Sequence, residues 1–567
     1  VLFDLVRTLG DSPNSTSKTE FYAAVLEQLA DSPYVAGLDP QELGRLSDEI
    51  KATESPDSFC MVHRILFSIL RHSHKSAEEL PQAELEALNN KVKEVLASPE
   101  VYNIQGYKVW PDAKPTLDKF RSHGFKLGLL VNTSRPGKVH KILKEFGLDE
   151  FFDYIGTSAE LKSALPSTSI IDKVVSLLNP SDLWIVSDKL DRHIKAAQQS
   201  GHKAVWINLK PKHMARIIEA IDTRAVSYPS AVISLNQLPS LIAYHEVPDR
   251  IKVGYIYNKP HKKRNLAKKH FFIDNERISF QCLEPAANFD VQGDYDIIMH
   301  KAQYLMQENS PEISRRYLEY LNSRPTTVVL DPFDVVEYSK NRNTFLGGLI
   351  SVVGLGRDVH GFRVRAPWGY HIQVVTEETV SLLEEAMQLA GVQFPVMIKT
   401  ELQSTIAQAH TMRICFNMEG IRTAGAMYPT AVLVQEFVNH NATVYKAYTI
   451  GEFTAIFPRR SCGNLKSPGI DYIDFKTSEP WPEVLKSQEE PVVLELDSNM
   501  VKEISKIVSD FTGATLFGYD ILVQDGTNDM VIVDFNSMPG FTEISDVSEP
   551  LWRLIEQKAR RLSLAPY

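Results

Sequence analysis

Three polar residues interrupt two strongly apolar segments near the C-terminal end of the sequence. The segments are GYDILVQ and MVIVDFNS, and the turn-rich DGTND lies between them, a pattern typical of a β-hairpin. If the hairpin is symmetric about Thr527, Asp520 lies opposite Asp534, and Asn536 shares the face of Asp534 because side chains alternate along a strand. Two like charges in direct opposition destabilise a sheet. The pattern therefore predicts either a divalent cation site or a solvated hairpin edge without an ion.

The ligand types favour magnesium if an ion binds at this hairpin. Asp and Asn oxygens are hard ligands, and Mg²⁺ also keeps waters and takes phosphate oxygens. The hairpin is followed by SMPGF, a turn that includes Gly540 and offers backbone N–H groups to phosphate. We therefore treat Asp520, Asp534 and Asn536 as candidate metal ligands.

The bulk composition predicts a multidomain globular protein. The 567 residues exceed what one hydrophobic core supports, and 43% hydrophobic with 23% charged residues is ordinary for a globular chain. The net charge of −10 argues against nucleic-acid binding, and we find no apolar run that would insert into a membrane. Four scattered cysteines fit a reducing compartment. We expect a cytoplasmic monomer, with a nuclear location left open, and a few leading residues missing before Val1.

The first half of the chain predicts a parallel sheet with a helical insertion. A strand at VLFDLV is followed by a long helical stretch at about residues 19–99. Apolar strands then alternate with amphipathic helices, for example KLGLLVN, GKVHKILKEFG and DLWIVSD. This alternation is typical of an α/β fold with helices on both faces of a parallel sheet. We place the end of this domain near residues 247–250.

The second half is again mixed α/β, but hairpin-linked strands predict an antiparallel C-terminal sheet. Its first strand, KVGYIY, precedes the densest basic run of the chain, KPHKKRNLAKKH, which extends from Lys259 to His270. The end of a strand is where α/β folds bind ligands. The run is therefore a candidate anion site, with a solvated charged face as the alternative.

Six colinear blocks from Val253 to Phe541 resemble the inositol 1,3,4-trisphosphate 5/6-kinase (inositol tris/tetrakisphosphate kinase) family, which has an ATP-grasp fold. The most specific block is QEFVNHNATVYKAYTIGE. The others are VGYIYNK, DIIMHK, VVLDP, FPVMIKT and the hairpin GYDILVQ to VIVDFNSMPGF. The resemblance implies an ATP-grasp kinase domain at residues 251–567.

The resemblance also implies which residues bind ATP, the co-substrate. Lys399 matches a lysine that contacts the phosphates, Arg342 an arginine and Ser461 a serine that contact ATP. The resemblance further implies a hinge between the two lobes that clamp adenine, and the residues that would line the base are Gln435, Glu436, Phe437 and Val438. The alternative for Lys399 is a solvated strand end, and the alternative for the hinge is a plain buried strand.

The acceptor carries several phosphates, so its site needs clustered cations. The resemblance implies an inositol-phosphate lysine in the basic run, at Lys259 or Lys262. The further substrate-binding residues that it implies are Lys301, His410, Lys446, Asn536 and Gly540, with Arg459 and Arg460 adding charge nearby. We expect Lys446, His410 and Asp534 to serve catalysis, with two Mg²⁺ ions as cofactors.

One loop departs from the family pattern. Between Lys399 and His410 the family has a loop with Gly and His, whereas this chain reads TELQSTIAQA. That loop covers phosphates and shapes the inositol pocket in the family. We therefore expect a substrate preference that differs from the name-giving trisphosphate.

Residues 1–247 resemble the haloacid dehalogenase-like fold, a Rossmann-like domain with a helical cap at about residues 11–107. Asp4 stands at the position of the nucleophile, but the general-acid position holds Val6, which cannot transfer a proton. The other motif positions are Val131 with Thr133 nearby, Leu165 with Lys162 nearby, Asp188, and His193 with Asp191 nearby. We expect a degenerate hydrolase domain, with residual hydrolase activity as the alternative. This fusion resembles a bimodular plant branch of the kinase family.

The leading hypothesis is therefore a Mg²⁺- and ATP-dependent inositol polyphosphate kinase acting on inositol tris- and tetrakisphosphates, with phosphate exchange between isomers if it runs backwards. One alternative is an ATP-grasp carboxylate–amine ligase, which shares the ATP end but does not need the basic run. The other is a catalytically silent protein that binds inositol phosphates, as the missing loop glycine suggests.

Overall fold

The computed structural model divides the chain into two compact units, which we describe separately. The first comprises Val1–Pro248 and Ile273–Gly293, and the second comprises Asp249–Phe272 and Asp294–Tyr567. Residues 273–293, which we expected in the second domain, thus lie with the first unit. The described residues are 1–5, 7–11, 18–53, 61–76, 78–102, 104, 106–207, 218–219, 221–223, 227–256, 271–301, 311–403, 411–466, 469–477, 479–486 and 490–564. Within them, no helix combines the length and apolar character needed to cross a membrane.

A parallel sheet forms the centre of the first unit, as the sequence predicted. Its strands are β1 (Leu2–Phe3), β4 (Gly128–Val131), β5 (Tyr154–Thr157), β6 (Trp184–Ser187), β7 (Lys203–Ile207) and β8 (Ser230–Val232). They pair in the order β5-β4-β1-β6-β7-β8, and each pair is parallel. Strands β4 and β6 are buried along their whole length, as expected where a sheet is covered on both faces.

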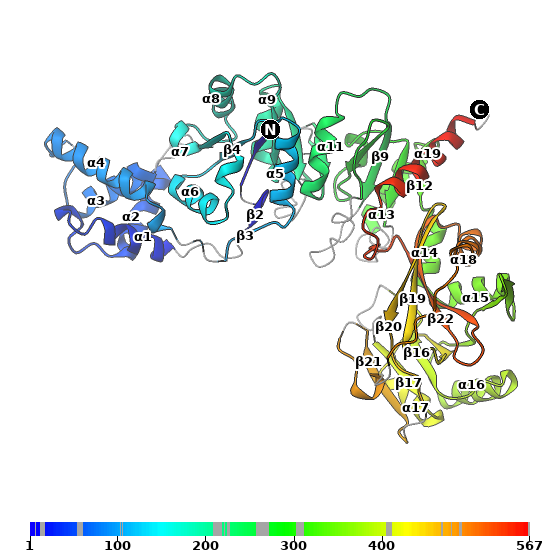
Figure 1. The fold of residues 1–567 in the computed structure, drawn as a ribbon. Coiled ribbons are helices and arrows are strands. Elements are labelled where there is room, and N and C mark those ends of the chain that lie inside the picture. The colour runs from blue at the N-terminus through cyan, green and yellow to red at the C-terminus, as the bar shows by residue number, and fades with distance from the viewer. Residues whose placement is uncertain are drawn as a thin grey trace. The chain divides into compact units, whose positions relative to one another are not determined.

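Helices follow the strands of this sheet, and a separate group of helices forms the expected cap. The sheet helices are α5 (Ala113–Ser122), α6 (Pro136–Glu145), α7 (Ser158–Leu161), α8 (Ser169–Leu178), α9 (Lys195–Gln199) and α11 (Leu238–Ala243), and a π-helical turn at Leu190–Ile194 precedes α9. The cap helices are α1 (Lys18–Gln28), α2 (Pro40–Thr53), α3 (Met61–His72) and α4 (Gln82–Ala97). Figure 1 shows α1 to α4 gathered outside the sheet, where they share a core of their own.

Two short segments complete the first unit. Strands β2 (Gly10–Asp11) and β3 (Lys108–Val109) form a short antiparallel pair where the chain enters and leaves the cap. Strand β10 (Ile278–Cys282) docks beside β8, where the Gln281 side chain accepts from the N–H of Ala231 and donates to the carbonyl of Pro229. This docking explains why residues far along the sequence belong to the first unit.

The second unit begins with parallel strands and continues into an antiparallel sheet and then a sheet that is antiparallel except where β14 (Phe362–Arg365) pairs with β23 (Met530–Ser537) in parallel. The first part contains β9 (Ile251–Ile256), β11 (Ile297–His300) and β12 (Val328–Leu330), which pair in parallel in that order, with α13 (Pro311–Asn322) and α14 (Phe333–Lys340). The next part is a sheet of order β15-β18-β16-β17-β21 with α16 (Glu377–Ala390) and α17 (Met418–Arg422). Its strands are β15 (Gly369–Ile372), β16 (Val396–Thr400), β17 (Thr411–Cys415), β18 (Val432–Glu436) and β21 (Tyr472–Lys476).

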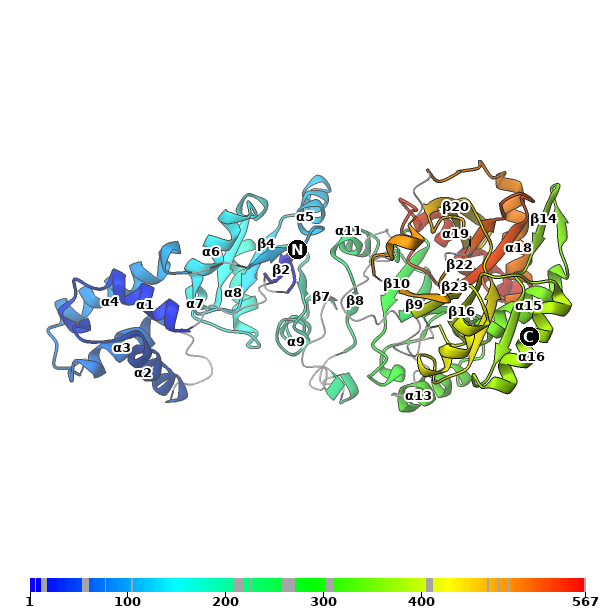
Figure 2. The same cartoon turned by 90° about the horizontal axis from the view of Figure 1, so that it is seen from below.

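The last sheet carries the hairpin with which the sequence analysis began. Its strands are β13 (Arg357–Val359), β14 (Phe362–Arg365), β19 (Thr443–Ile450), β20 (Phe453–Arg460), β22 (Leu516–Val523) and β23 (Met530–Ser537), in the order β13-β14-β23-β22-β19-β20. Helices α15 (Arg342–Val353) and α18 (Ser498–Thr512) contribute apolar side chains to one core with β22 and β23, and Figure 2 shows them beside these strands. Helix α19 (Ser548–Leu564) ends the described chain.

A buried carboxylate fastens the parallel strands to this last sheet. Asp331, directly after β12, accepts hydrogen bonds from the backbone N–H groups of Thr515 and Leu516, at 2.9 Å each, and from the Thr515 hydroxyl. Thr515 immediately precedes β22 and Leu516 is its first residue, so the bonds set the position at which the hairpin enters the fold. Asp331 is 8% exposed, and these donors would therefore be costly to leave unpaired.

We expect the Asp331→Ala substitution to destabilise the second unit by about 2–3 kcal/mol, because two buried N–H groups lose a charged acceptor. Differential scanning calorimetry should show a lower Tm. The control is Asp334→Ala, an exposed carboxylate in the first turn of α14, which should shift the Tm little. Equal Tm values for both variants would contradict the anchoring role of Asp331.

Candidate active site

The hairpin brings the three candidate metal ligands to one face. In the pairing of β22 with β23, Asp520 lies opposite Asp534 and Gly518 lies opposite Asn536. This pairing confirms the opposition of the two carboxylates that the sequence predicted. The amide of Asn536 also donates to the Asp534 carboxylate at 3.3 Å.

A β-bulge produces this arrangement, and the sequence analysis did not predict it. Nearer the turn, Ile521 pairs with Ile532, whereas beyond the irregularity Asp520 pairs with Asp534, so Val533 is an extra residue in β23. If the pairing near the turn continued unchanged, Asp520 would face Val533 and the side chain of Asp534 would point to the other face. Bulges that re-aim a side chain are common next to active sites.

The carboxylates lie in a row of charged side chains across three strands. Lys446 on β19 is the partner of Asp520, and its Nζ lies 3.1 Å from Oδ1 of that carboxylate. Burial raises the pKa of Asp520, the Lys446 ammonium lowers it and the charge of Asp534 raises it further. One lysine thus faces two carboxylates, which leaves negative charge available to a cation.

The residues fit magnesium. Two carboxylates in direct opposition with an amide oxygen beside them give hard oxygen ligands, and a cation between them would remove their mutual repulsion. Within the described ranges, no group of three or more His, Cys, Asp or Glu side chains is placed to hold a metal ion. The site would therefore take the rest of its ligands from Asn536, water and phosphate oxygens, as Mg²⁺ typically does.

Two cations lie beside this site: Lys399 is buried and Arg342 is half-buried. Lys399 on β16 is 8% exposed, and its Nζ donates to Oε1 of Gln435 at 2.7 Å. The pKa of Lys399 is lowered to about 8, chiefly by burial and also by the charge of Arg342, while Asp534 and Asp520 act in the opposite direction. Lys399 therefore has a neutral partner and remains available to an anionic ligand.

Arg342 stands at the first position of α15, and the helix cap holds it there. The Asn341 side chain accepts from the N–H groups of Asn343 and Thr344, at 2.9 and 3.0 Å, which fixes the start of the helix. The Arg342 guanidinium donates to the carbonyl of Thr400 at 2.6 Å. Burial lowers the pKa of Arg342 and the charge of Asp534 raises it. Arg342 therefore interacts electrostatically with the hairpin that carries the candidate metal ligands.

Gln403 is a site residue that the sequence analysis missed. Its side-chain amide donates to Oδ1 of Asp534, and its backbone N–H donates to the carbonyl of Lys340 at 2.8 Å. Gln403 lies in the stretch that departs from the family pattern. Because its partner is far away in the sequence, no local spacing could have indicated the contact.

The hinge residues have partners of their own. The Glu436 carboxylate accepts from Arg365 at 2.5 Å and from the N–H of Trp368 at 2.6 Å. The N–H of Phe437 donates to the carbonyl of Pro395 at 3.2 Å. Glu436 thus holds the end of β18 in place, and the Gln435 side chain is directed to Lys399.

Ser461 also has a protein partner, which connects it to the hinge. Its hydroxyl lies 2.7 Å from Nε2 of His440, and Nδ1 of the same imidazole lies 2.6 Å from the carbonyl of Val438. Burial lowers the pKa of His440. The imidazole therefore bridges the predicted ATP-contacting serine and the last hinge residue.

The turn after the hairpin is fastened to the parallel strands. Lys301, directly after β11, donates from Nζ to the carbonyl of Met538 at 2.8 Å. The Phe541 ring is fully buried and stacks on Phe271, with centroids 5.6 Å apart. These contacts hold the backbone around Gly540 at the end of β11, beside a lysine that matches a phosphate-binding residue.

Arg459 on β20 is engaged near the same turn. Its guanidinium forms an ion pair with Glu543, and the Tyr448 hydroxyl donates to Glu543 at 2.5 Å. The charge of Arg459 is thus partly neutralised on the protein. Three further predicted residues, Lys259, Lys262 and His410, lie outside the described residues.

The first unit has a second carboxylate cluster, at the carboxyl ends of adjacent strands. Asp4 follows β1, Asp188 follows β6, and the Nζ of Lys189 contacts both, at 3.1 Å from Asp188. Burial raises the pKa of Asp4, but Lys189 and His193 together hold it below its ordinary value. Burial raises the pKa of Asp188, although Lys189 and Arg7 oppose this.

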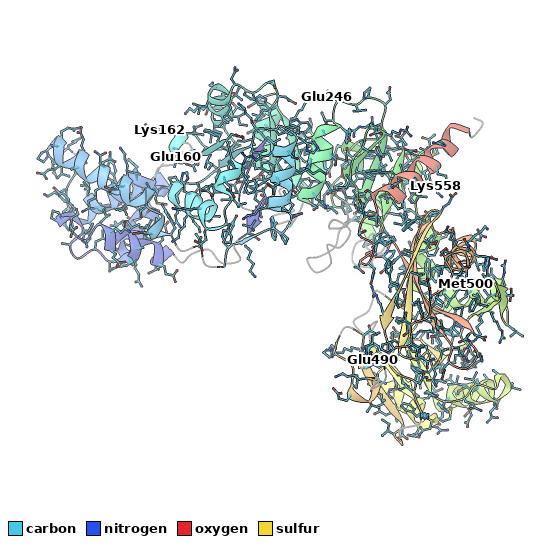
Figure 3. The ribbon with its side chains drawn as sticks, viewed as in Figure 1. Glu160, Lys162, Glu246, Glu490, Met500 and Lys558 are labelled. Carbon is cyan, nitrogen blue, oxygen red and sulfur yellow. The ribbon has the colours of Figure 1, made fainter. Side chains whose placement is uncertain are left out.

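The structure revises which residues surround Asp4. His193 is buried, with its pKa lowered to about 4 by desolvation, and its Nε2 lies 3.8 Å from Asp4. Asp191, the suggested substitute, is half exposed and pairs with Arg192 at 3.8 Å. Lys162 is exposed at the end of α7, beside Glu160 in Figure 3, so Lys189 is the lysine that contacts the carboxylate.

The remaining motif positions are apolar or structural, and Val6 lies outside the described residues. Val131 and Leu165 are each 5% exposed and belong to the packed interior. Thr133 exchanges backbone hydrogen bonds with the hydroxyl of Ser158, at 2.8 and 2.9 Å. These residues support the loops around Asp4.

Two family models match the chain. Residues 367–556 match the inositol 1,3,4-trisphosphate 5/6-kinase ATP-grasp domain, which includes Lys399, Lys446 and the whole hairpin. Residues 1–201 match haloacid dehalogenase-like hydrolase. Both matches agree with the folds that the sequence predicted, and an ATP-grasp kinase domain uses ATP, typically with Mg²⁺.

Several curated relatives carry one kind of name. Inositol-tetrakisphosphate 1-kinase 6 of Oryza sativa subsp. indica is 31% identical over 40% of this chain and 43% of its own length, so the chain spans less than half of that relative. Inositol-tetrakisphosphate 1-kinase of Xenopus laevis is 26% identical over 52% of this chain and 76% of the relative. Inositol-tetrakisphosphate 1-kinase 3 of Arabidopsis thaliana is 25% identical over 56% and 89%.

Solved structures were found for each half. A 2-haloacid dehalogenase from Pseudomonas syringae pv. Tomato DC3000 is 20% identical over 43% of this chain and 96% of that chain, with a TM-score of 0.31. A D-alanine–D-alanine ligase from Bacillus anthracis is 11% identical over 55% and 99%, with a TM-score of 0.37. The chain is thus similar to the inositol 1,3,4-trisphosphate 5/6-kinase ATP-grasp domain over residues 367–556 and to haloacid dehalogenase-like hydrolases over residues 1–201.

Proposed function

We propose that the second unit is a Mg²⁺- and ATP-dependent kinase that phosphorylates inositol tris- and tetrakisphosphates. The observation that carries the proposal is the opposition of Asp520 and Asp534, with Lys446 beside one carboxylate and the charge of Lys399 coupled to both. Phosphoryl transfer needs positioning and charge neutralisation more than covalent chemistry, and this arrangement supplies both. The names of the relatives point to the same acceptor class.

Each group has a task in this scheme. Asp520, Asp534 and Asn536 would hold Mg²⁺, which supplies neutralisation of the charge on the transferred phosphate. Lys399 binds the phosphates of ATP, because the direct hydrogen-bond partner of its ammonium group, Gln435, is neutral. Lys446 lies one strand further and faces the acceptor phosphates.

Lys301 and the Gly540 turn form the acceptor side of the proposed site. Lys301 is held by the carbonyl of Met538, so the ammonium and the backbone N–H groups of the turn are positioned together. We propose that the basic run with Lys259 and Lys262, together with His410, adds cations for the remaining phosphates. We further propose that two Mg²⁺ ions bind, that the phosphoryl transfer is reversible, and that the protein is a monomer.

We expect Asp534→Asn to lower kcat/KM by about 100-fold or more, because the metal loses a charged ligand while the side-chain shape is kept. The assay follows ADP and phosphorylated products with Mg²⁺, ATP and a panel of inositol tris- and tetrakisphosphates. The matched control is Asp510→Asn, an exposed carboxylate on α18 paired with Lys506, which should leave kcat/KM unchanged.

Three results would contradict the proposal. Undiminished turnover in Asp534→Asn would remove the metal assignment. If the unsubstituted protein binds inositol phosphates but forms no product from any of them, the silent binding protein becomes the better description. ADP release that depends on an amino acid would instead indicate a carboxylate–amine ligase.

The pKa of Lys399 predicts an alkaline limb in the pH profile of kcat/KM for ATP. The ammonium that binds phosphate is present below about pH 8 and is lost as the pH rises through that value. One unit above this pKa about nine-tenths of the lysine is neutral, so kcat/KM should fall about tenfold.

The control for this profile is Lys399→Arg, because a guanidinium stays charged throughout the range. Its kcat/KM for ATP should lack the decline, whatever its absolute value. An unsubstituted enzyme with a flat profile, or an arginine variant with the same decline, would show that another group titrates.

A further inference from the structure

We propose that the ammonium group of Lys189 replaces a divalent cation as the counter-charge of Asp4 and Asp188. The first unit would then be built around a closed ion-pair cluster that binds no metal. The motifs of the haloacid dehalogenase-like fold, which residues 1–247 resemble, include a pair of aspartates that binds Mg²⁺ at this place. The residues present do not fit that ion.

The position of the cluster is that of a ligand site. Asp4 and Asp188 follow β1 and β6, which are adjacent parallel strands in the middle of the sheet. Ligands of open α/β sheets bind outside the carboxyl ends of such strands. An ion pair that fills this position therefore occupies the place where a metal and its substrate would lie.

Each carboxylate oxygen of the pair already has a partner. Oδ1 of Asp4 accepts from the N–H of Leu5 at 2.9 Å, and Oδ2 contacts the Lys189 ammonium, with the Ser187 hydroxyl at 3.4 Å. Oδ1 of Asp188 lies 3.1 Å from Lys189, and Oδ2 lies 2.8 Å from Nε of Arg7. Because the Lys189 ammonium contacts an oxygen of each carboxylate, a metal ion bound between Asp4 and Asp188 would have to displace it.

The charges of the cluster also balance. Asp4 and Asp188 supply two negative charges, and Lys189 and Arg7 supply two positive charges. The side chains of the two carboxylates are 2% and 6% exposed, and that of Lys189 is 16% exposed. A divalent cation would add two uncompensated charges to a buried site, which is strongly unfavourable.

The same contacts disfavour phosphoryl chemistry at this site. A carboxylate nucleophile must direct an oxygen lone pair at phosphorus, and the Leu5 N–H on Oδ1 and the Lys189 ammonium on Oδ2 stabilise the Asp4 carboxylate and lower its nucleophilicity. The ion pair consequently preserves the strand ends of the fold while it makes Asp4 a weaker nucleophile. Lys189 is thus a structural substitute for the metal.

The test counts metal ions on the full chain. The chain carries Asp520→Asn and Asp534→Asn, because the carboxylates of the second unit would otherwise bind the probe. Mn²⁺ serves as the probe, and electron paramagnetic resonance distinguishes bound from free ions during a titration. We compare this chain with the same chain carrying Lys189→Met, and with Lys162→Met as the matched control.

We expect no bound Mn²⁺ while Lys189 is present, and one bound ion per chain in Lys189→Met, because two buried carboxylates then lack a counter-charge. Lys162→Met should gain none, since Lys162 is exposed. A stoichiometric ion in the chain with Lys189 intact, lost on Asp188→Asn, would overturn the proposal. So would a folded Lys189→Met chain that binds no ion.

A second measurement decides the matter if Lys189→Met does not fold. The chain with Lys189 intact is unfolded by heat in excess chelator and in excess Mg²⁺, and the transition of the first unit is followed. We expect the same Tm in both, and a Tm raised by Mg²⁺ only when Asp188 is present would overturn the proposal. Folding of Lys189→Met/Asp188→Asn, which removes one charge of each sign, would show that charge imbalance caused the failure.

Discussion

The register of the β22–β23 hairpin is the constraint on which the proposed chemistry of the second unit depends. Val533 shifts the pairing by one residue, so Asp520 and Asp534 face each other. The opposite face carries Tyr519 and Phe535, which pack in the core with α15 and α18. Without the shift, the Asp534 carboxylate would enter that core at a high cost in desolvation. Core packing therefore selects the register that assembles the metal ligands.

Lys399 and Lys189, both largely removed from solvent, show that one residue type can serve opposite purposes. Lys399 has a neutral partner, Gln435, and burial lowers its pKa, so its charge is left for an incoming anion. Lys189 has two carboxylate partners, and they raise its pKa against the effect of burial. The first lysine is prepared for a ligand, whereas the second is already satisfied. The contrast agrees with the proposals that the second unit carries the kinase activity and that the first unit is built around a closed ion-pair cluster.

Sequence reasoning succeeded where partners are close along the chain. The opposition of Asp520 and Asp534 follows from a local hairpin, and the parallel sheet of the first unit follows from the alternation of strands and helices. It failed for the contacts of Gln403 with Asp534 and of Lys189 with Asp4, which join residues more than a hundred positions apart. It also favoured Lys162 over Lys189, because distance along the chain does not reveal which lysine the fold turns toward a carboxylate.

Strand β20 is the last strand of its sheet within the described part of the chain, and its end is unusually protected. Pro458, Arg459 and Arg460 occupy its final positions and are exposed. Proline lacks a backbone donor, and charged side chains discourage the addition of a further strand from another molecule. Arg459 and Arg460, which we expect to add positive charge near the turn at Gly540, thus also protect the edge of the sheet. Their loss would therefore favour self-association of the protein.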